Sequence, residues 1–162
     1  MARHTAVVLV VLVLQAAPSS RALAPSVDVE EAEPTYETVD CPATFTFDYT
    51  LEKVWSSYDL RHYRCLGYED LTFTALRIEA PTRRVPAKAT LYMTLDWGHD
   101  KVVRGKFLLL GEDGRQLYER PVVAEIEEGR SNSTPIRLPG VRQDLIEEVR
   151  RVGLRIDSIV DD

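Results

Sequence analysis

The residues best suited to ligand chemistry gather in one short aromatic and basic segment. Three tyrosines, two arginines and one histidine fall within residues 58–68: Tyr58, Arg61, His62, Tyr63, Arg64 and Tyr68. Aromatic rings stack on planar groups, and Arg guanidinium groups form forked hydrogen bonds with anions. The segment therefore indicates a surface for a small ligand or a glycan. The alternative is a connecting segment whose tyrosines pack on the edge of the domain.

A second candidate is the acidic pair Glu112-Asp113, which lies between Gly111 and Gly114 after a strongly apolar run. A calcium loop needs several more oxygen ligands at fixed spacing. A hairpin loop needs only a short polar sequence and a glycine that takes a positive φ. The sequence predicts a type I turn at 112–113, with Gly114 in a bulge, and no metal.

Little in the sequence suits a catalytic mechanism. A hydrolytic triad needs a base, and His62 and His99 are the only histidines after residue 4. The paired carboxylates are adjacent in sequence, so on a strand they point to opposite faces instead of converging. The chain also lacks a glycine-rich phosphate loop and a dinucleotide fingerprint. We expect a protein that is not an enzyme and holds no cofactor.

The two cysteines, Cys41 and Cys65, both follow the N-terminal apolar run. An oxidising compartment favours a bridged pair, and the closed loop would stabilise the fold by about 3 kcal/mol. Structural zinc requires four close-spaced ligands, which two cysteines and two histidines do not supply at this spacing. The sequence predicts a disulfide bond and no metal site.

Apolar and polar residues alternate with a period of two along most of the chain, which predicts strands. The expected strands are 44–55, 71–78, 88–97, 102–110, 115–126, 136–138 and 152–156. The apolar phase slips near 75–76, which indicates a bulge or a stretch buried on both faces. Pro121 makes 115–126 an edge strand or a strand interrupted by a bulge. Residues 127–134 are expected to form a polar loop, and the apolar spacing over 141–152 predicts one short helix.

Two points in this assignment stay open. Residues 51–62 also carry apolar side chains at helical spacing, so a helix competes with the strand and with the connection expected at 56–68. Trp55 and Trp97 would make a sugar-stacking platform if both were exposed. Both fall on the apolar phase of their strands, so we expect them in the core.

About seven strands at spacings of 10–15 residues, with at most one short helix, predict an all-β domain. The pattern fits an antiparallel two-sheet β-sandwich of immunoglobulin-like or fibronectin-like type.

The N-terminal segment predicts export. A short basic start precedes the apolar run 6–14, which is too short to span a membrane, so residues 1–22 form a signal peptide cleaved near residue 22 or 24. Residues 23–40 form an acidic, flexible leader, because 28–40 holds six acidic residues and no Lys or Arg. The single domain, 41–162, carries 20 acidic and 18 basic residues, a net charge of −2. Near-neutral charge excludes the usual nucleic-acid binders, which need a concentrated basic face.

These observations predict a secreted or periplasmic, non-enzymatic module that binds an extracytoplasmic protein partner or supports an assembly there. The alternative is a small-ligand or glycan-binding module that uses segment 58–68. We expect no membrane span after signal cleavage. Exposed aromatic rings in 58–68 would favour the alternative, whereas packed rings together with a bare edge strand would favour a protein partner.

Overall fold

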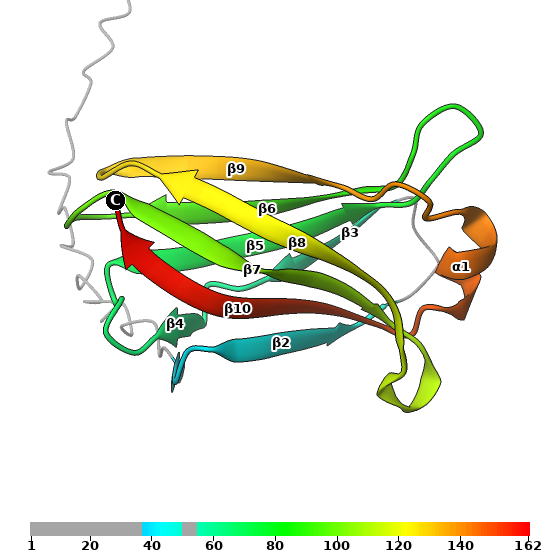
Figure 1. Ribbon diagram of the computed structural model, residues 1–162, viewed down its shortest axis with the longest axis horizontal. Coiled ribbons are helices and arrows are strands. Elements are labelled where there is room, and N and C mark those ends of the chain that lie inside the picture. Colours follow the sequence, from blue (N-terminus) through cyan, green and yellow to red (C-terminus); the bar gives the residue numbers. More distant parts are fainter. Residues whose placement is uncertain (1–36, 50–54) are drawn as a thin grey trace, which may run out of the picture. The chain divides into compact units, whose positions relative to one another are not determined.

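Two antiparallel four-stranded sheets make up most of the computed structural model, which describes residues 37–49 and 55–162 (Figure 1). The first sheet has the order β2-β10-β7-β8. Its strands are β2 (Ala43–Asp48), β10 (Arg151–Asp161), β7 (Lys101–Leu110) and β8 (Gln116–Ile126). The second sheet has the order β3-β5-β6-β9. Its strands are β3 (Trp55–Asp59), β5 (Leu71–Glu79), β6 (Lys88–Leu95) and β9 (Arg130–Arg137).

Four short elements complete the described part of the chain. β1 (Glu37–Val39) pairs in parallel with β4 (Tyr63–Cys65). A 3-10 turn, η1 (Glu112–Gly114), joins β7 to β8, and the helix α1 (Gln143–Glu148) precedes β10. The expected all-β fold with one short helix is therefore confirmed for the described residues.

The inward faces of the two sheets share one hydrophobic core, which makes the architecture sandwich-like. Alternation along each strand places every second side chain on this face. In the first sheet Phe107 of β7 lies opposite Leu154 of β10, and in the second Leu76 of β5 lies opposite Leu91 of β6. All four are fully buried in the same cluster.

Several local predictions are confirmed. The β5–β6 pairing shifts register between Phe73 and Ala75, a bulge close to the position expected at 75–76. β8 contains Pro121 and lies at the edge of its sheet. Residues 111–115 close the β7–β8 hairpin, and Gly114 has a φ of +74°. The predicted type I turn is wrong in one respect, because Asp113 also takes a positive φ, of +58°, which Asp tolerates better than most residues.

Two predictions of secondary structure, the strand at 44–55 and the loop at 127–134, are wrong. Residues 44–55 are not one strand, because β2 ends at Asp48 and Trp55 begins β3 in the other sheet. Within the described range 55–65 the chain forms β3 and β4, not a helix. Residues 127–134 are not a loop, because β9 begins at Arg130 and pairs with β6. The polar composition of β9 follows from its place at a sheet edge, where most of its side chains meet water.

The disulfide bond between Cys41 and Cys65 confirms the predicted pairing, with the two Cα atoms 5.4 Å apart. It fastens the segment between β1 and β2 to the end of β4. The predicted signal peptide, its cleavage site and most of the predicted leader lie outside the described residues. Within the described ranges, no helix has the length and apolar character needed to cross a bilayer.

Candidate functional site

The three tyrosines of segment 58–68 are half-buried and pack against the core. The Tyr58 ring stacks on Phe47 with centroids 5.1 Å apart, and the Tyr63 ring lies 4.9 Å from Phe45. Tyr68 donates its hydroxyl to the Ile159 carbonyl at 2.7 Å. Each ring thus contacts the body of the fold, and the three do not gather into one exposed stacking surface.

The basic residues of segment 58–68 do not lie together with its tyrosine rings. Arg61 is exposed and grips Asp59, with Nη2 2.6 Å from Oδ2, and these hydrogen bonds lower the pKa of Asp59 to about 2. His62 is exposed beside the same carboxylate, and Arg64 is half-buried in β4. Burial raises the pKa of Tyr58 to about 12. The predicted site residues therefore do not converge on one ligand position.

Trp97 is an exposed aromatic residue, whereas the sequence predicted the aromatic site in segment 58–68 and Trp97 in the core. The prediction of a core residue is wrong, because the residue is 66% exposed. β6 ends at Leu95, so the alternation no longer governs the turn 96–100, in which Gly98 has a φ of +108°. The side chain of Trp55 lies outside the described residues.

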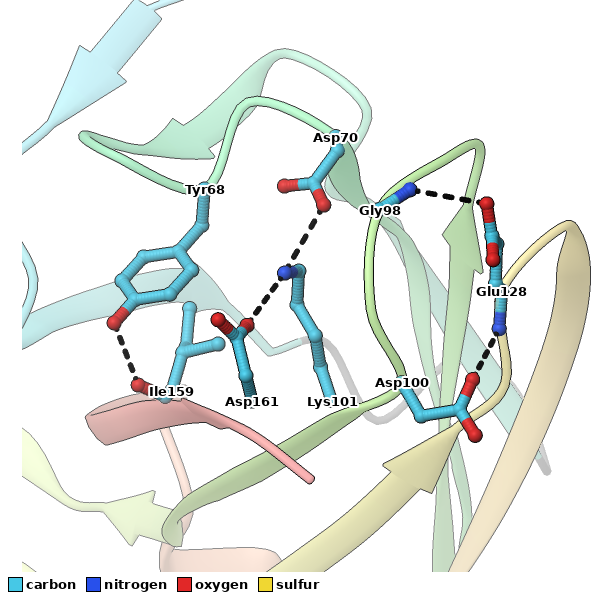
Figure 2. A network of polar contacts seen from close by, with 8 residues as sticks. All are labelled: Tyr68, Asp70, Gly98, Asp100, Lys101, Glu128, Ile159 and Asp161. Atoms are coloured by element: carbon cyan, nitrogen blue, oxygen red, sulfur yellow. Dashed lines mark hydrogen bonds and ion pairs between the residues drawn. The ribbon is translucent and has the colours of Figure 1, made fainter.

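A buried ion-pair network holds the base of this turn (Figure 2). Lys101, the first residue of β7, places its Nζ 3.1 Å from Asp70 Oδ2 and 2.9 Å from Asp161 Oδ1. The Lys101 and Asp70 side chains are only 7% and 9% exposed. The Lys101 ammonium also lies 5.6 Å from the centre of the Tyr68 ring. Burial lowers the pKa of Lys101, but its hydrogen bonds to the two carboxylates outweigh burial and leave the pKa raised.

A second set of hydrogen bonds ties the turn to the connection between β8 and β9 (Figure 2). Glu128 donates its N–H to Asp100 Oδ1 at 2.8 Å, and Gly98 donates its N–H to Glu128 Oε1 at 3.3 Å. Asp162 donates its N–H to the Asp100 carbonyl at 2.8 Å. These bonds hold the turn that carries Trp97 from several sides. We call the turns 96–100 and 127–129, together with residues 161–162, the loop end.

The loop end is predominantly acidic, and it continues into a groove. Its exposed charged side chains are mostly carboxylates, and Arg130, which follows the turn 127–129, pairs with Glu127 at 3.0 Å. A groove of about 620 Å³ extends from Asp100 and Asp162 between β8 and β9. Its lining adds Glu125 and the polar side chains of β9. A positively charged group would find complementary charge at Asp100, Glu125 and Asp162, although Arg130 also lines the groove.

The sequence carried a signal for the buried network that the prediction of sites missed. Lys101 shares the inward phase of Val103 and Phe107 along β7, and Asp161 shares that of Ile159 along β10. A lysine at an inward position of a strand indicates a nearby carboxylate partner, because its charge is not stable there alone.

His62 and His99 are both exposed, beside Asp59 and Asp161 respectively. Among residues 37–49 and 55–162, no group of three or more His, Cys, Asp or Glu side chains is arranged to hold a metal ion.

Comparison of the sequence with models of protein families finds no matching family, and comparison with curated proteins finds no matching relative. The class of protein is therefore defined here by the structure alone: an all-β, sandwich-like domain with one disulfide bond and a firmly held acidic loop end.

Proposed function

We propose that the chain is an exported, non-enzymatic module that binds an extracytoplasmic protein partner through the loop end. The observation that carries the proposal is the large exposure of Trp97 on a turn fixed by buried ion pairs and hydrogen bonds. Trp is among the residues that most often dominate the energy of a protein interface. A rigid turn also loses little conformational entropy when it binds.

The charge of the loop end specifies the chemistry of the partner. Asp100, Glu128 and Asp162 surround the turn, so the matching surface should carry Lys or Arg side chains. One such cation can lie over the Trp97 ring while its neighbours pair with the carboxylates. Export itself rests on the N-terminal sequence, and the disulfide bond is consistent with an extracellular or periplasmic compartment.

The small-ligand or glycan alternative on segment 58–68 stays a prediction. The packing of the three tyrosines against the core supports the protein-partner proposal over it. The immunoglobulin-like or fibronectin-like assignment also stays a prediction, supported by the antiparallel two-sheet architecture.

A capture experiment in the cells that make the protein tests the proposal. An affinity tag belongs in the exposed loop 82–85 before β6, because a tag after Asp162 would lie against the loop end. Mild crosslinking outside the cytoplasmic membrane, followed by mass spectrometry, identifies what the chain contacts. We expect a partner with a basic surface that Trp97→Ala no longer retains.

Val85→Ala is the matched control, since Val85 is also an exposed apolar residue but lies in the loop before β6 and does not line the groove. The control should retain the partner. Equal capture by Trp97→Ala and the wild type would contradict the proposed role of the loop end. Specific release of the captured material by free sugar or another small ligand would favour the alternative.

A further inference from the structure

In the two four-stranded sheets the open edges of β2 and β3 carry no proline, unlike those of β8 and β9, and β2 is the longer of the two. Tyr49 donates its N–H to the Arg150 carbonyl at 2.8 Å and so continues the β2–β10 ladder by one residue. The N–H and C=O groups of a strand residue point to the same side and alternate from residue to residue. Those of Thr44, Thr46 and Asp48 therefore point away from β10. No strand of residues 37–49 and 55–162 pairs with that side.

The edges of β8 and β9 carry prolines at the equivalent positions. The Glu125 carbonyl accepts a hydrogen bond from Asn132 Nδ2, so Glu125 and, by alternation, Pro121 face the open edge of β8. Ser133 donates its N–H to Asn132 Oδ1 at 2.7 Å, so Ser133 and Pro135 face the open edge of β9. A proline has no N–H to donate, and an N–H that is already hydrogen-bonded is not free to pair. Both features discourage another strand from adding to these edges.

The side chains of β2 are complementary to a second copy of the same strand. An antiparallel pair centred on Thr46 would place Thr46 opposite Thr46 and Thr44 opposite Asp48 of the second copy. The two-fold arrangement gives three pairs, one Thr46–Thr46 pair and two Thr44–Asp48 pairs. The backbone groups of all these residues face the open edge, so each pair would exchange two hydrogen bonds. Thr–Thr contacts and a hydroxyl beside a carboxylate are favourable cross-strand neighbours, and no like charges meet.

The inward side chains agree with the same register. Phe45 would lie opposite Phe47 of the second copy, and aromatic cross-strand pairs are favourable. Phe47 is only partly buried within one copy, where it stacks on Tyr58. Pairing would cover the part of this ring that the single copy leaves exposed.

We propose that two copies of the chain associate by antiparallel pairing of their β2 strands around a two-fold axis at Thr46. The pairing would join the two β2-β10-β7-β8 sheets into one continuous eight-stranded sheet. The inference does not depend on partner binding at the loop end, because it uses a different strand and different residues.

Sedimentation equilibrium of the exported full chain over a range of concentrations tests the proposal. The wild type should show a monomer–dimer equilibrium. Thr46→Pro removes the central N–H from both copies and should raise the dimer dissociation constant about tenfold or more. Thr46→Val keeps this N–H and should change the constant by less than about threefold.

A second pair of variants tests the register and does not depend on a proline. Thr44→Asp would place a carboxylate opposite Asp48 of the second copy and should weaken the dimer. Thr44→Lys would place a cation there and should strengthen it. Thr46→Cys should form a disulfide-linked dimer under oxidising conditions, because paired residues at such positions lie about 5.5 Å apart between Cα atoms.

Three results would overturn the proposal. A wild type that stays monomeric up to about 1 mM, the weak end of the affinity scale, excludes the dimer. A dimer that Thr46→Pro leaves intact uses another surface. The wild type could instead be a monomer that captures another protein, which its Thr46→Pro variant no longer retains. In that case the β2 edge pairs with a different chain. Trp97→Ala should leave the dimer unchanged, so failure of this inference and failure of the proposed function are distinguishable.

Discussion

Lys101→Met is the substitution that most directly tests how the loop end is held. The lysine side chain is 7% exposed, and its removal would leave the Asp70 carboxylate buried without its cation. Breaking a buried ion pair from one side costs about 3–5 kcal/mol. We expect a loss of about 3 kcal/mol, the lower end of that range, because the Asp161 side chain is 57% exposed and water reaches the network there.

Urea denaturation at pH 7, followed by tryptophan fluorescence, measures this loss in the free energy of unfolding. Lys106→Met is the matched control, since Lys106 lies on the same strand and pairs with Glu119 nearer the surface. The control should cost less than about 1 kcal/mol. The double variant Lys101→Met/Asp70→Leu should recover most of the loss, because neither charge is then buried alone.

Two results would refute the reasoning. A cost for Lys101→Met no larger than that of Lys106→Met would mean that the Asp70 carboxylate is well solvated despite its burial. A double variant as unstable as Lys101→Met would mean that the lost stability comes from packing and not from an unpaired charge.

The same network predicts how stability depends on pH. The hydrogen bond from Lys101 lowers the pKa of Asp161 in the folded state. A carboxyl group of this kind contributes stability above its unfolded pKa, which is about 4, and loses that contribution as the pH falls through the lower folded pKa. Asp161→Asn should therefore lack this part of the acid sensitivity of the wild type in denaturation curves taken below pH 4.

Three further predictions concern other parts of the fold. Replacing both Cys41 and Cys65 by Ser should lower the free energy of unfolding by about 3 kcal/mol, and reductant should reproduce the loss in the wild type but not in the variant. Gly105→Ala should cost about 3 kcal/mol or more, because a Cβ would lie 2.1 Å from the Arg155 carbonyl oxygen. Gly129→Ala, where a Cβ meets open space at a positive φ, should cost only about 1 kcal/mol in the same urea titration. Spectrophotometric titration of the tyrosines should show one phenol ionising near pH 12, in agreement with the pKa of Tyr58, and Tyr58→Phe should remove it.

The parts of the fold that the sequence predicted well are those in which one face of a strand is buried. β6 alternates regularly because its inward residues enter the core while its outward residues remain partly exposed. β9 was missed for the opposite reason. Its Ser131–Thr134 stretch lies at a sheet edge, where backbone pairing with β6 needs no apolar side chain.

Local patterns could not reveal where a strand changes sheet or where a turn begins. Phe47 and Tyr58 both look like inward residues of one region, yet they come from β2 and β3 in different sheets, and their rings stack on each other. Trp97 follows the phase of β6, but the strand has already ended at Leu95. The candidate site was therefore placed on tyrosines that hold the fold together, while the exposed aromatic residue was assigned to the core.

The position of β10 has a consequence for the order of events during synthesis. This strand, Arg151–Asp161, lies between β2 and β7, which precede it by many residues in the chain. Until this strand has emerged, β2 has no neighbour among the described strands of its sheet and β7 is paired with β8 alone. The first sheet can therefore close only after residues 151–161 have been made, whereas every strand of the second sheet has been made by Arg137.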